Sequence, residues 1–299
     1  MKKDIRDIFF ENIKNQFLKD KKMYILTNDA DVYSLQSIKT NKRFIDAGVA
    51  EQNLVNMAAG LGANNKKTLV YGFCTFLTFR CYEQLKFNIA SHNANCKIIG
   101  VGPGFSFSND GPTHHGIQDI QLFNLIPEFE IINISDNNLA NIVSKNLFKI
   151  KGPVYVRLEK GVQNYNSNII YNLNQGFQFT KKYKTSKKII ITTGYFCKIA
   201  NEVSDKKKID VLNLFRLKNF NHKKFINICF KYDEIVVYDE NTEYGGILPV
   251  ILNIFSKKKV KAKIKTLCIK DKQYFIYSDN REKILFKLKI DKKSLEKIF

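Results

Sequence analysis

Short apolar runs alternate with segments of helical periodicity along the whole chain, and this alternation constrains the fold more than any other feature. The first apolar runs lie at residues 23–26, 68–71, 97–101, 130–134 and 154–158, and helical patterns lie at residues 5–17, 52–63, 79–93 and 137–149. Strands that alternate with helices form mostly parallel sheets with helices on both faces. The sequence therefore predicts an α/β fold.

A polar segment at residues 163–186, rich in Asn, Gln, Tyr and Lys, separates this series from a second one. The second series has apolar runs at residues 188–193, 209–214, 234–239 and 260–267, with helical patterns after residues 195 and 246. A chain of 299 residues is long enough for two domains that each bury a core. We expect two mostly parallel-sheet α/β domains, at residues 1–162 and 187–299, joined by a linker at residues 163–186.

The net charge of +21 has two interpretations. A charge of this size attracts nucleic acid or anionic lipid, and it would suit a basic binding or scaffold protein without catalytic activity. However, the lysines are spread along the chain in short polar stretches, and no basic stripe is interleaved with aromatic residues. Because Lys, Asn and Ile are abundant together, compositional bias is the better interpretation. The positive field would still help to collect phosphorylated substrates.

The cysteines and the apolar runs argue against other classes of protein. Six cysteines are scattered without a C-x-x-C pair, which favours reduced, buried thiols over disulfides or a zinc site. No apolar run is long enough to span a bilayer, and the first residues form an amphipathic pattern that contains acids, unlike a signal sequence. We expect a cytoplasmic protein that does not enter a membrane.

Three polar loops follow predicted strands, at residues 46–52, 71–82 and 102–119. Open α/β sheets bind ligands at this carboxyl edge. In the first loop, Glu51 begins a helix among small residues. The helix dipole favours an acid in the first turn, so a purely structural role is the alternative to a functional one.

The other two loops carry aromatic and ionisable side chains. Phe76, Phe79 and Tyr82 follow one another at three-residue spacing, and on a helical turn they would form a wall suited to stacking a planar heterocycle. Ordinary core packing is the alternative. The third loop holds Asp110 and the adjacent pair His114-His115. A surface turn is the alternative there, but ionisable groups in such a loop indicate binding or catalysis.

These three loops, in this order, resemble the pyrimidine-binding domain of the transketolase family. Residues 50–52 match that family's A-E-Q, residues 75–82 match T-F-L-x-F-x-x-Y, and residues 110–114 match D-G-P-T-H, with agreeing separations. The second domain resembles the family's C-terminal domain, including Asp239-Glu240 followed by Gly245-Gly246. The resemblance covers nearly the whole chain.

The resemblance implies a site for thiamine diphosphate. Glu51 would hydrogen-bond N1′ of the aminopyrimidine and so promote loss of the proton from C2 of the thiazolium. Phe76, Phe79 and Tyr82 would hold the aminopyrimidine ring. Asp31 is a further candidate for an acid near the cofactor, on a looser alignment.

The resemblance also implies a sugar or sugar-phosphate substrate. Asp110, His114 and His115 would bind its hydroxyl groups, with His114 able to donate or accept a proton. Arg157 falls near the family's phosphate-binding arginine, although a salt bridge at a strand end explains it nearly as well.

Two departures from the family pattern bear on the reaction. Gly102 stands where transketolases place a histidine that helps to hold the substrate phosphate. No G-D-G motif occurs, although family members use one to hold the Mg²⁺ that binds the diphosphate. We expect a split enzyme, in which a partner chain resembling the family's N-terminal part supplies G-D-G and Mg²⁺. Two copies of each chain would form a heterotetramer, and this chain itself would bind no metal.

The leading hypothesis is transfer of a two-carbon ketol unit between sugars. The run His114-His115-Gly116 also resembles deoxyxylulose-phosphate synthases, so a decarboxylating carboligase is an alternative, as is a subunit like the beta chain of 2-oxo-acid dehydrogenases. A non-catalytic basic protein with this fold is the alternative of another class.

Overall fold

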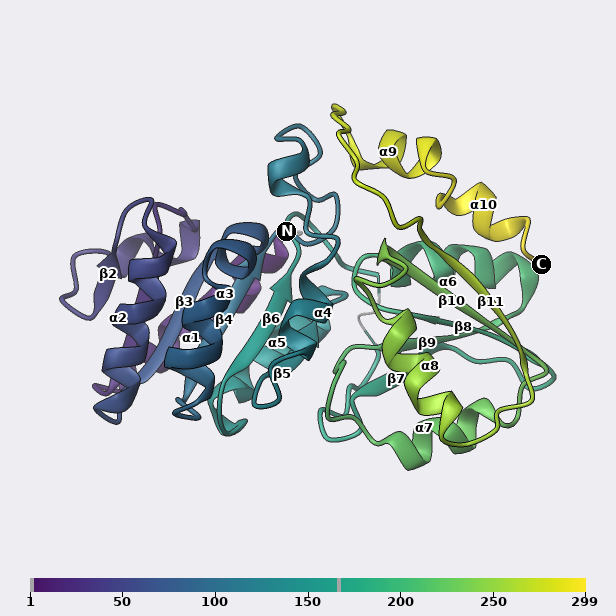
Figure 1. The fold of residues 1–299 in the computed structure, drawn as a ribbon, viewed down its shortest axis with the longest axis horizontal. Coiled ribbons are helices and arrows are strands. Elements are labelled where there is room, and N and C mark those ends of the chain that lie inside the picture. The colour runs from purple at the N-terminus through teal and green to yellow at the C-terminus, as the bar shows by residue number, and fades with distance from the viewer. Residues whose placement is uncertain (1–2, 166–167) are drawn as a thin grey trace. The chain divides into compact units, whose positions relative to one another are not determined.

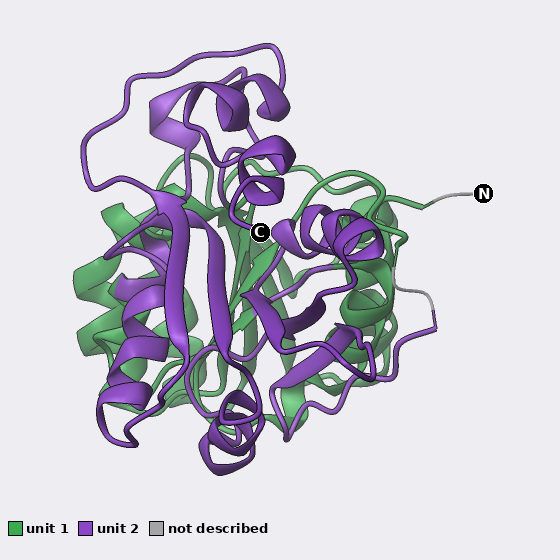
Figure 2. Ribbon diagram, turned by 90° about the vertical axis from the view of Figure 1, so that its right-hand side faces the viewer, with its two compact units in different colours: residues 1–103, 122–132, 136–167 green, residues 104–121, 133–135, 168–299 purple. Residues whose placement is uncertain are grey.

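The computed structural model describes residues 3–165 and 168–299, which form two compact units. Unit 1 contains the described residues of 1–103, 122–132 and 136–167, and unit 2 contains those of 104–121, 133–135 and 168–299 (Figure 2). The chain therefore passes between the units several times.

Unit 1 is built on a six-stranded sheet of order β2-β1-β3-β4-β6-β5 (Figure 1). Its strands are β1 (Met23–Thr27), β2 (Phe44–Asp46), β3 (Lys67–Phe73), β4 (Cys96–Val101), β5 (Glu130–Asn133) and β6 (Val154–Leu158). The four pairs from β2 to β6 are parallel. Both β4 and β6 are buried along their whole length, which accounts for their mostly apolar sequences, interrupted only by the buried Lys97 and Arg157.

Helices cover both faces of this sheet, with α2 and α3 in front of it and α1 behind it in Figure 1. The helical elements of this unit are α1 (Ile5–Lys19), η1 (Tyr33–Ile38), α2 (Glu51–Ala63), η2 (Phe76–Arg80), α3 (Tyr82–Gln84), η3 (Leu85–Ala90), α5 (Asn137–Asn146) and η5 (Leu147–Lys149). Helix α4 (Asp119–Asn124) has its first residues in unit 2 and its last in unit 1. Helix α1 buries Ile5, Phe9, Ile13 and Phe17 at helical spacing and packs against α5. The Asp4 carboxylate caps its first turn by accepting from the Arg6 amide at 2.8 Å.

Unit 2 is built on a five-stranded sheet of order β11-β10-β8-β9-β7. Its strands are β7 (Phe177–Lys181), β8 (Lys188–Thr192), β9 (Asp210–Leu214), β10 (Glu234–Thr242) and β11 (Lys263–Ile269). All neighbours are parallel except the edge strand β7, which runs antiparallel to β9. Its helical elements are η4 (Pro112–His114), α6 (Phe196–Lys207), α7 (His222–Cys229), α8 (Leu248–Ser256), α9 (Arg281–Lys287) and α10 (Lys292–Glu296).

One core of unit 2 joins the sheet to helices α6, α9 and α10. Ile190, Val211 and Val236 point into it from three neighbouring strands. Phe105 and Ile117, which lie in the loop after β4, are buried in the same core. This burial is the physical reason why residues 104–121 group with unit 2.

The prediction of an α/β fold with mostly parallel sheets is confirmed. The units nevertheless divide the chain differently from the expected domains 1–162 and 187–299, because residues 104–121 and 133–135 group with unit 2. Residues 177–181 of the expected linker form β7, since Phe177 is buried and the segment pairs with β9. The regular helix expected at residues 79–93 is interrupted: two π-helical turns, η2 and η3, flank α3.

Among the helices of residues 3–165 and 168–299, none combines the length and the apolar composition that crossing a membrane requires.

Candidate active site

Glu51 is a buried carboxylate at the first position of α2 in unit 1. Only 4% of the residue is exposed, although a carboxylate loses much solvation when it is buried. Two donors compensate for this loss: Asn28 Nδ2 lies 3.0 Å and Arg80 Nη1 lies 2.9 Å from Glu51 Oε1. Glu51 is thus held by two side-chain donors in addition to its place in the first turn of the helix.

Asn28 reaches Glu51 from the carboxyl end of β1. Its amide lies so close to Gly72 on the neighbouring strand β3 that a Cβ at Gly72 would come within 2.2 Å of Asn28 Oδ1. Among the described residues, Asn28 Oδ1 has no hydrogen-bond partner even though the residue is buried. An unpaired buried acceptor beside a buried carboxylate is suited to a ligand that donates hydrogen bonds.

Arg80 covers one aromatic ring of the site. Its guanidinium carbon lies 4.1 Å from the centroid of the Phe76 ring while the same group forms the ion pair with Glu51. The side chain of Arg80 is 48% exposed, so it can leave this position without opening the core. A planar cation stacked on an aromatic ring and bonded to a carboxylate occupies the kind of space that a planar heterocycle needs.

The three predicted aromatic residues lie in the segment after β3, and none of them is fully buried. Phe79 is exposed, and Phe76 and Tyr82 are half-buried, while Leu77 and Cys81 form the core side of the segment. Because Phe76 and Phe79 lie in a π-helical turn and Tyr82 begins α3, they do not share a single regular helix. Core packing alone does not explain such exposure, and π-turns are frequent at functional sites.

Asp31, the other acid predicted near the cofactor, lies in the loop after β1 with its side chain largely exposed. It forms an ion pair with Lys39 at 2.7 Å and accepts from Gln36 Nε2 at 2.6 Å. The hydrogen bond from Lys39 lowers the pKa of Asp31. These contacts engage Asp31 with η1 and its end rather than with Glu51.

Cys81 lies on the core side of this segment. Burial raises the pKa of its thiol to about 12, and the nearby Glu51 carboxylate adds to the increase. The thiol is therefore protonated at neutral pH and is no nucleophile.

The loop with the two histidines lies in unit 2 and is closed at its base. Gly104 and Gly116 exchange two backbone hydrogen bonds, at 2.8 and 3.0 Å. Between them, Asp110 is exposed and His114 is half-buried at the end of η4. His114 Nδ1 lies 3.0 Å from the hydroxyl of Thr113, and the His114 ring lies 6.1 Å from that of Phe107. Asp110 and His114 are thus accessible on one closed loop.

His115 points the other way. Its ring meets the Phe105 ring edge to face at 4.8 Å, and it is only 4% exposed. Burial lowers the pKa of His115 to about 4, helped by the neighbouring His114, so the ring is neutral at pH 7. A direct contact between this ring and a sugar would require the loop to open.

Two further positions concern a substrate phosphate. Gly102 has a φ of 77°, a backbone conformation that favours glycine over the histidine expected from the family. Arg157 is buried in the middle of β6, opposite Gly100 of β4. The structure therefore gives its guanidinium no direct access to a bound phosphate.

Unit 1 fits the pyrimidine half of thiamine diphosphate, since it combines a buried carboxylate, an orphaned amide oxygen and partly exposed rings. For a metal, the described residues contain no cluster of three or more His, Cys, Asp or Glu side chains.

Asn28 and Arg80 were not predicted from the sequence. A signal for Asn28 exists, because it follows a buried strand at the same sheet edge as Glu51. Arg80 has no such signal, since its contact with Glu51 depends on the π-helical turn.

Residues 3–166 match the family model described as transketolase, pyrimidine binding domain. One subunit of the apulose-4-phosphate transketolase of Phocaeicola vulgatus is 28% identical over 227 residues, which cover 74% of this chain and 73% of that protein. The 1-deoxy-D-xylulose-5-phosphate synthase of Neisseria meningitidis serogroup C is 27% identical over 233 residues, 77% of this chain but only 36% of the synthase.

A solved structure described as a split gene transketolase, inactive beta4 tetramer, has the same fold. It superposes with a TM-score of 0.81 at 21% identity, and the match covers 98% of this chain and 96% of that one. The match therefore extends over both units.

Proposed function

We propose a function for this chain on the ground that it belongs to the family of the transketolase pyrimidine-binding domain. It is a transketolase-type enzyme chain that depends on thiamine diphosphate. The activity we propose is transfer of a two-carbon ketol unit between sugars, carried out together with a partner chain. The observation that carries the proposal is the buried Glu51, held by Asn28 and Arg80 beside partly exposed aromatic rings.

In this proposal, Glu51 holds and shares a proton with N1′ of the aminopyrimidine. Its burial makes the carboxylate a strong hydrogen-bond partner, because few water molecules compete for it. Asn28 fixes the orientation of the carboxylate through its Nδ2 donor. When bound, thiamine diphosphate supplies the nucleophilic carbon and the electron sink of the reaction.

Phe76, Phe79 and Tyr82 would enclose the pyrimidine ring. Arg80 stacks on Phe76 in the present structure, so it must move for the ring to bind there. Its exposure makes this movement inexpensive. Asp31 stays a weaker candidate, since it is engaged with Lys39.

Asp110 and His114 would bind hydroxyl groups of the sugar, with His114 exchanging a proton with one of them. His115 supports the loop from below through Phe105. We assign no phosphate contact to Gly102, and one through Arg157 would require its buried side chain to become accessible.

A partner chain would bind the diphosphate and its Mg²⁺. The relative from Phocaeicola vulgatus is named as one subunit of a transketolase, and the similar solved structure is called a split gene transketolase. Both names support the existence of a partner chain. That this partner carries the G-D-G motif, and that two copies of each chain form a heterotetramer, are part of the same proposal. The expected cytoplasmic location belongs to the same proposal.

A deoxyxylulose-phosphate-synthase-like reaction is the second candidate. The similarity to the Neisseria synthase supports it, and Gly102 stands where transketolases proper have a histidine. Incubation of the two-chain complex with pyruvate or with ketose phosphates separates the candidates, since only a decarboxylating carboligase releases CO₂.

The test uses Glu51→Gln in the complex with the partner chain. We expect turnover to fall by at least ~10²-fold, since the amide cannot share a proton in the same way. Exchange of the C2 proton of thiamine diphosphate, followed by NMR, should slow by a similar factor. The matched control is Glu83→Gln, because Glu83 is an exposed glutamate in the neighbouring helix α3. Near-normal turnover and C2 exchange in the Glu51→Gln complex would refute the role of Glu51.

A further inference from the structure

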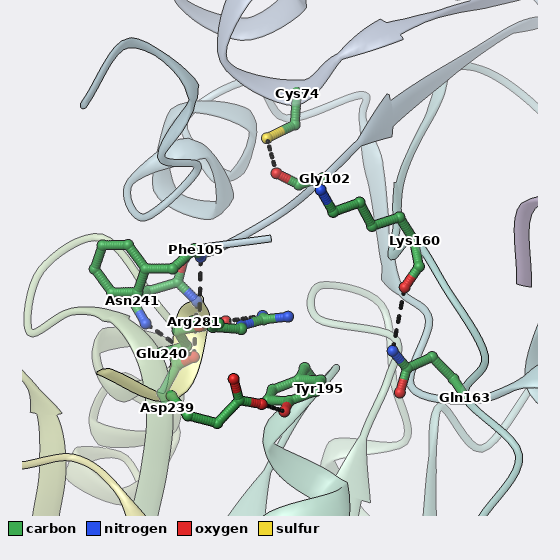
Figure 3. Close-up of polar contacts among 11 residues, drawn as sticks. Cys74, Gly102, Phe105, Lys160, Gln163, Tyr195, Asp239, Glu240, Asn241 and Arg281 are labelled. Carbon is green, nitrogen blue, oxygen red and sulfur yellow. Dashed lines mark hydrogen bonds and ion pairs between the residues drawn. The ribbon is translucent and has the colours of Figure 1, made fainter. Parts of the chain in front are cut away.

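The base of the loop that carries Asp110 and His114 is held by a carboxylate from β10. The Phe105 amide donates to Glu240 Oε1 at 3.3 Å (Figure 3). Gly104, one residue earlier, has a φ of 61°, and a Cβ there would lie 1.9 Å from Glu240 Oε2. Glu240 therefore contacts the backbone at the point where the Gly104–Gly116 hydrogen bonds close the loop.

Arg281 fixes the position of Glu240. Its Nε donates to Glu240 Oε1 at 2.6 Å, and its Nη2 donates to Glu240 Oε2, which makes the pair bidentate. Both side chains are at least 90% buried, with 10% and 9% exposed. The Tyr195 ring lies against the guanidinium at 3.8 Å, and the Tyr195 hydroxyl lies 3.1 Å from Glu282. Figure 3 shows Arg281 beside the Glu240 carboxylate, with Tyr195 close by.

The same part of unit 2 contacts the loop at its tip and on its return. The Ser278 amide donates to the Ser108 carbonyl at 3.2 Å, and the Tyr277 ring packs so close to Gly111 that a Cβ there would overlap it. On the return, the Thr242 amide donates to the Ile117 carbonyl at 3.0 Å. Contacts at the base, tip and return leave the loop little freedom to shift.

We propose that Glu240 and Arg281 are positioning residues, which set the loop geometry that presents Asp110 and His114 to the substrate. This inference rests on the proposed function, because it assumes that the loop binds the sugar. It assigns the β10–α9 region a catalytic purpose beyond stabilising its own domain.

The chemistry of the pair supports positioning over simple stability. A buried ion pair is a weak source of stability, and apolar residues of similar volume would often serve as well. Apolar residues, however, could not accept the hydrogen bond that the Phe105 amide donates. They would therefore not fix the backbone conformation beside Gly104. A bidentate pair restricts the orientation of the carboxylate, and so restricts the amide that it binds.

The test begins with hydrogen exchange of the full chain in the variant Glu240→Gln. We expect amides at residues 104–117 to exchange at least ~10-fold faster, while the rest of unit 2 changes little. The matched control is Asp210→Asn: Asp210 is also buried, pairs with Lys182 at 2.5 Å and accepts from the Tyr183 amide at 2.7 Å. That variant should leave residues 104–117 unchanged.

Kinetics of the complex with the partner chain supply the second readout. Glu240→Gln should raise the KM for the sugar and lower kcat, while the affinity for thiamine diphosphate stays within ~2-fold, since Glu51 lies in unit 1. Arg281→Met should lower kcat and raise the KM for the sugar, and both changes should be smaller in Arg281→Lys. If the other variants fold poorly, Tyr277→Ala supplies a further variant, because it alters an exposed side chain. Hydrogen exchange should become faster only at the tip of the loop in Tyr277→Ala.

Unchanged exchange at residues 104–117 in a folded Glu240→Gln variant would overturn the proposal. So would faster exchange spread evenly through unit 2, because that result marks a purely structural pair. The hydrogen-exchange result does not depend on the reaction. Failure of the proposed function, read from Glu51→Gln, is therefore distinguishable from failure of this inference.

Discussion

Acid should destabilise the chain through His115. The ring packs against Phe105, and in the part of the chain that the structure describes neither ring nitrogen has a hydrogen-bond partner. A proton added there would be buried without an acceptor. Of the charged groups nearby, His114 opposes protonation and Asp110 favours it, but burial is the largest effect and lowers the pKa to about 4.

The sign and size of the effect follow from this pKa. In the unfolded chain the ordinary value of 6.5 applies, so between pH 6.5 and 4 the unfolded state binds more protons than the folded one. The contribution of His115 to the free energy of unfolding is therefore fully present above pH 6.5 and is lost as the pH falls towards 4. A difference of 2.5 pKa units corresponds to about 3.5 kcal/mol, at roughly 1.4 kcal/mol per unit.

Urea unfolding of the full chain between about pH 4.5 and 7.5 measures this loss. We expect His115→Phe, which keeps an apolar ring in the site, to remove most of the acid slope. His92→Gln, at an exposed histidine, should leave the slope unchanged. NMR titration of the four histidines gives the pKa of His115 directly. An ordinary pKa for His115, or an equal acid slope in His115→Phe, would refute the reasoning.

Three more predictions concern single side chains. Arg80→Met should lower the free energy of unfolding by about 1–2 kcal/mol, because Glu51 is buried while Arg80 is half exposed, and a double-mutant cycle with Glu51→Gln should show the coupling. Burial lowers the pKa of Lys97 from 10.5 to about 7, so the free energy of unfolding should rise by about 4 kcal/mol between pH 7 and 10. Lys97→Met should abolish this rise, and a similar rise in the variant would contradict the prediction. Gly104→Ala should lower the free energy of unfolding in urea by about 2–4 kcal/mol, because it adds backbone strain and a clash with Glu240. Gly161 has a φ of 80° and open space around it, so Gly161→Ala should lower the free energy of unfolding by less. Equal losses in the two variants would exclude the clash.

The sequence predicted the parallel strands well, because their side chains are buried on both faces. The run at residues 154–158 coincides with β6, and the run at 23–26 differs from β1 by one residue. Strand β7 was missed, because a half-buried edge strand has polar residues on its exposed face. The break at Cys81 was missed because a π-turn retains helical spacing over short distances.

The site was predictable as residue types and not as contacts. The position of Glu51 at the start of a helix could be read from small neighbours and an apolar strand before it. The assignment of the histidine loop to unit 2 could not be predicted from the sequence, because burial of Phe105 and Ile117 in that unit depends on residues far along the chain. For the same reason His114 and His115, adjacent in sequence, were given one role, although one is accessible and the other is buried.

Two buried glutamates of this chain are each paired with an arginine, and the exposure of the arginine distinguishes their purposes. Arg281 is buried, bidentate and covered by Tyr195, so its departure would deprive the buried Glu240 carboxylate of its charged partner. Arg80 is half exposed and holds Glu51 through a single nitrogen, so water can solvate the guanidinium as soon as it leaves. A ligand that donates one hydrogen bond and stacks on Phe76 can replace both contacts of Arg80. The Glu240 pair is therefore suited to fixing a loop, and the Glu51 pair is suited to exchange with a bound heterocycle.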